Sequence, residues 1–203
     1  MKTFLNSPEK DLGLCLVQAS LILLSIIFLG LWIQDPSLSF ALLLAGGWLI
    51  WTFVEYATHR FLMHELVIPG KKSDILNHQR HHQHPHDIKV KPHHRLVVLI
   101  FGIGILAIAF KLQNAFTILA GFFLGFLIYN YLHFLLHHPI GKHILPKIQR
   151  ANILHHTRYP HRGYSFSTIL WDWLFDTLPP KDAVITQKME QNFFGQPLKN
   201  KTT

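Results

Sequence analysis

Long runs of apolar residues are the feature of this 203-residue chain that most limits its fold. The four runs are Leu14–Ile33, Ser37–Ala57, Leu96–Leu112 and Phe116–Leu132. A helix needs about 20 apolar residues to cross the hydrocarbon core of a bilayer. The last two runs are near the short limit, so they either cross the core or enter it without spanning it. The pattern predicts an all-α integral membrane protein with about four transmembrane helices.

The lengths of the connections predict the topology. Residues 34–36 separate the first run from the second, and residues 113–115 separate the third from the fourth. Each connection is only three residues long, so each pair of runs forms a helical hairpin. The long segments 58–95 and 133–203 then lie on one side of the membrane and hold almost all of the Lys and Arg residues. The positive-inside rule assigns this side to the cytoplasm. We expect a multi-pass protein with a cytoplasmic helical cap, in the inner membrane if bacterial and in the endoplasmic reticulum if eukaryotic.

Charge and cysteine content narrow the class further. The formal net charge is +8, but the basic residues stand beside apolar runs, which indicates loops facing anionic lipid and no nucleic-acid partner. Cys15 is the only cysteine, so the chain has no internal disulfide, thiolate cluster or iron–sulfur centre. We expect one membrane domain over residues 1–180 and a polar tail over residues 181–203 that frays.

The histidines are clustered just outside the apolar runs. Imidazole is the commonest biological metal ligand, and in its neutral form it suits iron, zinc, copper and nickel. Six of the 16 histidines are interpreted as solvated loop residues: His84, His86, His93, His94, His143 and His161. Nine others are candidate ligands: His59, His64, His78, His81, His82, His133, His137, His155 and His156.

Spacing supports the candidate ligands. His78, His81 and His82 follow the i, i+3, i+4 pattern of one helical face, and His133 and His137 are also one turn apart. All candidates fall on the predicted cytoplasmic side. The pattern therefore predicts a site at the membrane surface.

The pair His59 and His64 fits this pattern less well. Five residues correspond to about 140° around a helix with about 3.6 residues per turn. On a regular helix the two side chains should not bind one ion. They serve two ions, or the helix ends between them.

Nine histidines are too many for one ion and suit two ions with open positions. A closed zinc site needs four ligands. No Asp or Glu stands among them at ligand spacing, so the site differs from the Glu-x-x-His di-iron bundle. The composition indicates an oxygen-activating dimetal centre. His138, which Pro139 follows, is either a ligand or a supporting residue.

Five stretches resemble one known family. They are residues 55–64 (EYATHRFLMH), 78–82 (HQRHH), 129–138 (YNYLHFLLHH), 152–156 (NILHH) and 163–177 (GYSFSTILWDWLFDT). Together they are similar to the membrane fatty acid hydroxylase family of the sterol desaturase superfamily. The resemblance implies four spans, a cytoplasmic cap with two iron ions, and O₂-dependent hydroxylation of a lipid acyl chain. Zinc can replace iron in purified protein. Electrons are expected from a separate donor protein.

The chain departs from this family at three positions. Asn152 stands where the family usually has histidine, Asn130 where it often has aspartate, and Asp176 where it has glycine. An asparagine binds metal more weakly than imidazole does, or binds through a water. Asn152 is therefore a possible metal-linked or water-linked residue.

Three further residues are candidates for supporting the ligands: Glu55, Asn130 and Asp172. A carboxylate at membrane depth is costly and usually functional. Glu55 either accepts the ring N–H of His59 or pairs with a basic residue such as Arg60. Asp172 either holds a metal histidine or caps a helix.

Aromatic residues have two interpretations. Trp48, Trp51, Trp171, Trp173 and Phe175 either line an acyl tunnel or belong to the interfacial belt and the core.

Two alternative functions stay open. The histidines act only as ligands, and no catalytic residue beyond the metal centre is expected. A sterol or carotenoid hydroxylase or desaturase would share this centre. Such an enzyme differs in the shape of its substrate, which the sequence does not show. A membrane divalent-metal binding or transport protein should carry polar ligands at mid-membrane, and the apolar runs nearly lack them.

Overall fold

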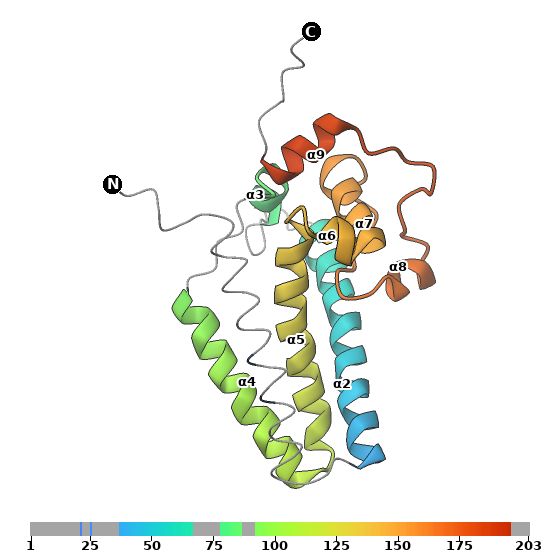
Figure 1. The fold of residues 1–203 in the computed structure, drawn as a ribbon. Coiled ribbons are helices and arrows are strands. Elements are labelled where there is room, and N and C mark those ends of the chain that lie inside the picture. The colour runs from blue at the N-terminus through green and yellow to red at the C-terminus, as the bar shows by residue number, and fades with distance from the viewer. Residues whose placement is uncertain (1–20, 22–24, 26–36, 67–77, 87–91, 196–203) are drawn as a thin grey trace, which may run out of the picture. The chain divides into compact units, whose positions relative to one another are not determined.

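The computed structural model describes residues 21, 25, 37–66, 78–86 and 92–195, and the elements in these ranges are helices (Figure 1). Apart from Leu21 and Ser25, the first predicted span, Leu14–Ile33, lies outside the described residues. The chain divides into two compact units, residues 1–51 with 90–131 and residues 52–89 with 132–203. Each unit is described by itself.

The first unit contains the helical hairpin of α4 (Pro92–Leu112) and α5 (Phe116–Leu136), together with the start of α2 (Leu38–Ala57). The last residues of α2 and α5 belong to the second unit. Within the three-residue connection, Gln113 adopts a left-handed conformation with φ 43°. The side chain of Asn114 then accepts a hydrogen bond from the backbone N–H of Phe116 at 2.9 Å, which caps the start of α5.

Helices α2 and α5 approach each other through glycines. A Cβ atom on Gly47 would lie 2.0 Å from the carbonyl oxygen of Ile118, and one on Gly121 would lie 2.0 Å from that of Leu44. Small residues at such crossings let two backbones touch, as is common between membrane helices. The buried side chains that pack around this hairpin include Phe40, Leu106, Ala109, Phe110 and Ala120.

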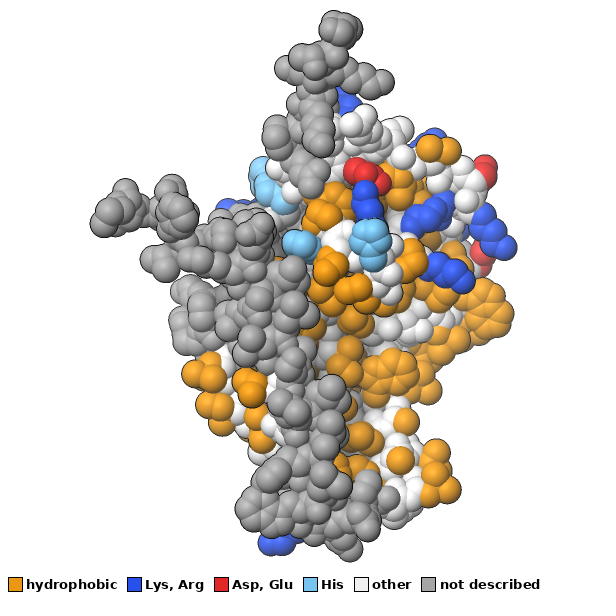
Figure 2. Space-filling model, viewed as in Figure 1, with side chains coloured by type: hydrophobic (Ala, Val, Ile, Leu, Met, Phe, Trp, Pro, Cys, Tyr) orange, Lys and Arg blue, Asp and Glu red, His pale blue; other side chains and the backbone are white. Residues whose placement is uncertain are grey.

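Two helices are long and apolar enough to cross a bilayer, Leu38–Glu65 and Phe116–Leu136. In the most apolar 18-residue stretch of each helix, only 22% and 28% of the residues are buried. The core helix of a soluble protein is mostly buried. The apolar part of α4 is shorter, Leu99–Leu112. Hydrophobic side chains cover much of the face that Figure 2 shows. Among the described residues the structure thus supports two candidate spans.

The second unit is built from short helices that follow the ends of α2 and α5. Residues Thr58–Glu65 continue α2 as a π-helix, η1. The others are α3 (His78–Gln83), α6 (Gly141–Ile144), α7 (Pro146–Thr157), α8 (Leu170–Leu174) and α9 (Gln187–Phe194).

Helix α9 lies within the segment that was expected to fray, whose last residues, 196–203, lie outside the described part of the chain. Thr186 caps its start by accepting a hydrogen bond from the backbone N–H of Met189, and Gly195 ends it with φ 63°. Phe193 is fully buried. Local caps and one buried aromatic ring therefore order this helix, although most of its residues are polar.

Candidate metal centre

The nine candidate histidines converge in the second unit. Eight of them form two groups, and within each group all the potential ligand atoms lie within 4.8 Å of one another. The first histidine group contains His59, His64, His78, His82 and His155. The second histidine group contains His81, His133 and His137. The three histidines of α3 share one helix, yet they are divided between the two groups.

The π-helix explains how His59 and His64 meet. In a π-helix hydrogen bonds run from residue i to residue i+5, so residues five apart are brought together. The two Nε2 atoms lie 3.3 Å apart. The expectation that these side chains cannot share an ion assumed a regular α-helix, and that assumption was wrong for residues 58–65.

The nitrogens of the first histidine group have the spacing of ligands around an ion. Nε2 of His78 lies 2.8 Å from that of His64, 3.2 Å from that of His59 and 3.0 Å from that of His82. Two ligand nitrogens that are each about 2.1 Å from one metal are separated by about 3.0 to 3.4 Å, for octahedral and tetrahedral angles respectively. The first histidine group therefore fits a metal ion.

The second histidine group is completed by side chains of α7. Nε2 of His133 lies 3.2 Å from Nε2 of His81. The rings of His156 and His137 have centroids 4.8 Å apart. Asn152 is buried, and its Nδ2 lies 3.3 Å from Nε2 of His137. The residue that replaces the family's usual histidine thus stands beside this group.

Buried polar atoms without partners also fit bound metal. Within the described part of the chain, no hydrogen-bond partner is found for Nδ1 of His137, Nε2 of His155, both ring nitrogens of His156 or Oδ1 of Asn152. Buried polar groups are nearly always paired, so such a concentration needs an explanation. Metal coordination would satisfy several of these atoms at once.

Backbone carbonyls set the tautomers of two histidines. Nδ1 of His59 lies 2.6 Å from the carbonyl oxygen of Tyr164, and Nδ1 of His155 lies 2.9 Å from that of Arg162. A carbonyl only accepts, so both Nδ1 atoms carry the proton. Each Nε2 is then left with a lone pair that can bind metal.

Burial keeps the histidines outside the candidate spans neutral. It lowers the pKa of His78 to about 2, of His81 to about 4 and of His82 to about 3. It also lowers the pKa of His155 and His156, with neighbouring imidazoles adding to the effect. Neutral imidazole is the metal-binding form.

Two of the predicted supporting residues, Glu55 and Asp172, accept hydrogen bonds from one loop. Glu55 meets neither His59 nor Arg60; its carboxylate accepts hydrogen bonds from the backbone N–H groups of Phe166 and Ser167 at 2.6 and 3.0 Å. Asp172 is buried and accepts from two other backbone N–H groups of the same loop, described below. For each carboxylate, a direct contact with a histidine was one of two alternatives, the other being a basic partner for Glu55 and a helix cap for Asp172. The bonds described here go instead to backbone N–H groups.

Two polar residues of α5 and its C-terminal turn lie outside the two groups. The exposed amide of Asn130 donates to the carbonyl of Phe126, one turn earlier, at 2.7 Å. Nδ1 of His138 accepts from the backbone N–H of Ile140 at 3.2 Å. Both of these contacts are local ones of a helix or its end.

The aromatic residues mostly pack between elements. Trp51 has edge contacts with Phe122 and Phe126 of α5. The indole N–H of Trp171 donates to Thr52 at 2.9 Å, whereas Trp173 is 66% exposed. These positions fit core and surface roles.

Phe193 is a site residue that the sequence analysis missed. Its ring stacks on His137 with centroids 4.6 Å apart, and it also contacts His156 at 5.4 Å. A cavity of about 350 Å³ is lined by Phe193 together with His82, His156 and Lys188 of α9, among others. Helix α9 therefore borders the histidine cluster.

Fold and site together define a helical protein with membrane-length apolar helices and a histidine-lined candidate metal centre. A sequence profile of the fatty acid hydroxylase family matches residues 44–177, and this chain belongs to that family. The profile covers all the candidate ligands.

Individual relatives agree with the family. The chain is 34% identical over 159 residues to fatty acid 2-hydroxylase of Rattus norvegicus, covering 73% of this chain and 42% of the rat protein. It is 32% identical over 148 residues to dihydroceramide fatty acyl 2-hydroxylase FAH2 of Arabidopsis thaliana, covering 68% of this chain and 61% of that protein. The chain thus spans about two fifths of the rat enzyme.

A solved structure shares the fold. It is full-length scs7p, in which only the hydroxylase domain is visible. The TM-score is 0.55 at 24% sequence identity, and the match covers 84% of this chain and 68% of that chain.

Proposed function

We propose that this protein is a membrane hydroxylase of fatty acyl chains with two metal ions, iron in the active form. The observation that carries the proposal is the convergence of nine histidines, eight in the two histidine groups and His156 against His137, some of them on the last turns of the two candidate membrane spans. Family membership supports the reaction type, and the relatives' names point to acyl chains rather than sterols or carotenoids. The nine histidines and Asn152 are proposed to surround the two ions.

The chemistry is the insertion of one oxygen atom into a C–H bond. Overall, the acyl C–H, O₂, two electrons and two protons give the alcohol and water. When bound, the metal pair would supply the activation of O₂ that imidazoles alone cannot supply. The protein's part is to hold neutral ligands in fixed orientations and to keep water from the site. The two electrons are proposed to come from a separate donor protein.

The same proposal includes a four-span topology with the site on the cytoplasmic face. The described residues support two of these spans, and the short connection between α4 and α5 favours a third in α4.

Aromatic side chains such as Phe166, whose ring contacts His59 and His133 at 4.8 Å, exclude water from the ligands.

Expression in a host that lacks hydroxylated acyl chains tests the function. Total fatty acids are released from cells that express the protein, a His137→Ala variant or a His143→Ala variant, and are analysed by mass spectrometry. His137 is buried in the second histidine group, whereas His143 is an exposed histidine of α6. We expect hydroxylated acyl chains with the unaltered protein and with His143→Ala, and none with His137→Ala.

Metal analysis of the purified proteins runs in parallel. We expect close to two metal ions per chain and a clear loss in His137→Ala. If the unaltered protein made no hydroxylated acyl chain while an electron donor was present, the proposed function would be wrong.

A further inference from the structure

One segment of the chain, residues 162–167, contacts both histidine groups. Its carbonyls at Arg162 and Tyr164 accept the Nδ1 protons of His155 and His59. The ring of Phe166 lies 4.8 Å from those of His59 and His133, which belong to different groups. The orientation of the ligands therefore depends on where this backbone lies.

Two buried carboxylates hold the 162–167 segment from different elements. Asp172 of α8 accepts the N–H of Tyr164 at 3.0 Å and that of Ser165 at 2.8 Å. Glu55 of α2 accepts the N–H groups of Phe166 and Ser167 and also the Ser167 hydroxyl. Four consecutive backbone donors thus have carboxylate acceptors. Charge-assisted bonds of this kind are stronger than neutral ones.

The conformation between the two carbonyls is also specified. Gly163 adopts φ 77°, a conformation that favours glycine, and its N–H donates to the carbonyl of Thr177 at 2.7 Å. Any Cβ there would lie 3.1 Å from the carbonyl oxygen of Ala151. The turn therefore separates the carbonyls that bind His155 and His59.

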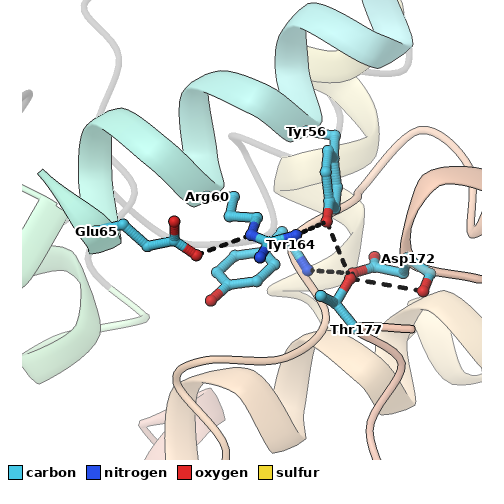
Figure 3. Close-up of polar contacts among 6 residues, drawn as sticks. All are labelled: Tyr56, Arg60, Glu65, Tyr164, Asp172 and Thr177. Atoms are coloured by element: carbon cyan, nitrogen blue, oxygen red, sulfur yellow. Dashed lines mark hydrogen bonds and ion pairs between the residues drawn. The ribbon is translucent and has the colours of Figure 1, made fainter. Parts of the chain in front are cut away.

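Further hydrogen bonds hold Asp172 in place. Its Oδ1 also accepts from the hydroxyl of Thr177 at 2.7 Å, and that hydroxyl lies 3.2 Å from the hydroxyl of Tyr56 (Figure 3). The Tyr56 hydroxyl in turn accepts from Arg60 at 2.9 Å. This chain of bonds links α8 back to the helix that carries His59.

We propose that Glu55 and Asp172 are positioning residues of the metal centre: by fixing the 162–167 segment, they set the tautomer and ring orientation of His59 and His155. The inference rests on the proposed metal centre and deepens it. Neither carboxylate touches the ligands, so neither is a catalytic residue. Partners of metal-bound histidines tune the affinity for the ion, typically by about 10-fold to 100-fold.

The geometry predicts unequal effects of two isosteric changes. Each of the two carboxylate oxygens of Asp172 accepts a backbone N–H, one from Tyr164 and the other from Ser165. In Asp172→Asn the new NH₂ group replaces one of these oxygens, so two hydrogen-bond donors face each other there. In Glu55→Gln, one oxygen can still accept both backbone N–H groups, and the new NH₂ can face Ser167, whose hydroxyl is able to accept. Each change replaces a carboxyl by an amide of nearly the same size and shape. The comparison therefore tests whether the hydrogen-bond geometry at the two positions differs as described.

The test uses the full chain, purified in detergent, stripped of metal and reloaded with Co²⁺. The variants are Asp172→Asn, Glu55→Gln and Glu55→Ala, with Asp182→Asn as the control because Asp182 is an exposed carboxylate. Three quantities are measured: the visible spectrum of bound Co²⁺, its affinity from chelator competition, and the thermal unfolding of the metal-free protein.

We expect Asp172→Asn and Glu55→Ala to shift the Co²⁺ spectrum and to weaken affinity by about 10-fold. Glu55→Gln and Asp182→Asn should resemble the unaltered protein. If Asp172→Asn does not fold, the comparison of Glu55→Ala with Glu55→Gln decides alone. Variants that only unfold at lower temperature, with an unchanged Co²⁺ spectrum, would overturn the positioning role. Equal effects of Asp172→Asn and Glu55→Gln would also overturn it. Absence of Co²⁺ binding by the unaltered protein would instead overturn the metal centre.

Discussion

Asn152 stands at a position of the proposed metal centre where the family resemblance led us to expect a histidine. Its side chain is buried one turn before His155 and His156 on α7, beside His137 of the second histidine group. Its Oδ1 has no hydrogen-bond partner among the described residues. An amide oxygen is a weaker ligand than imidazole for iron or zinc, so the second ion should be the more weakly held.

Substitutions at Asn152 follow from this placement. We expect Asn152→His to increase the metal retained after dialysis against a chelator, because it adds an imidazole beside His137. Asn152→Ala should lose little metal, and His156→Ala far more. Thermal unfolding of each variant controls for folding. Should Asn152→Ala lose as much metal as His156→Ala, Asn152 would be a full ligand and this ranking would be wrong.

At the scale of elements, α9 is the helix whose contribution to the site is least evident from composition. It places one fully buried ring, Phe193, against His137 and His156. The neighbouring Phe194 is partly exposed and lies over the ammonium group of Lys142. The two phenylalanines therefore form a matched pair, one inside the site and one outside it.

Phe193→Ala should destabilise the protein, since truncating a buried phenylalanine typically costs about 3–5 kcal/mol. It should also increase the rate of metal loss to a chelator, because the ring that packs on His137 is removed. Phe194→Ala serves as the control and should change both properties much less. Thermal unfolding and metal content measure the two effects. Equal metal loss in both variants would show that α9 does not support the ligands.

At the scale of the whole molecule, the proposed four-span topology makes a prediction about both faces of the membrane. After Cys15 is replaced by serine, single cysteines at positions 72 and 188 should react with an impermeant reagent only from the cytoplasmic side. Cysteines at positions 34 and 113 should react only from the other side. Labelling of positions 72 and 188 from opposite faces would contradict the topology.

The depressed histidine pKa values predict how acid affects the metal-free protein. In the unfolded chain histidines take up protons near pH 6.5, whereas His78, His81 and His82 in the folded state do so only near pH 2 to 4. Stability should therefore decrease as pH falls below about 6.5. Burial raises the pKa of Asp172, so this one carboxyl would by itself make the folded protein more stable as pH falls. It opposes the effect of the three histidines. Thermal unfolding between pH 8 and 5 checks this, and a midpoint that stays constant or rises would contradict it.

Much of the site could be predicted from local spacing, because neighbours on one helix face are separated by three or four residues. His78, His81 and His82 illustrate this. His59 and His64 were misjudged since spacing alone does not reveal a π-helix. The carbonyls of Arg162 and Tyr164 gave no signal, because every residue has a carbonyl and only tertiary structure selects two. Phe193 was missed because a single aromatic in a polar segment is a weak signal for a buried helix.

The helix that carries His59 and His64 is longer than a bilayer's hydrocarbon is thick. The 28 residues of Leu38–Glu65 extend roughly 40 Å at about 1.5 Å per residue, against about 30 Å of hydrocarbon. If the helix enters the hydrocarbon near Leu38, its last turns reach the level of the lipid headgroups. The carbons at that depth are the first ones of an acyl chain, next to its carboxyl or amide group. If the protein is the acyl-chain hydroxylase proposed above, we therefore expect it to add the hydroxyl group near the carboxyl end and not near the methyl end.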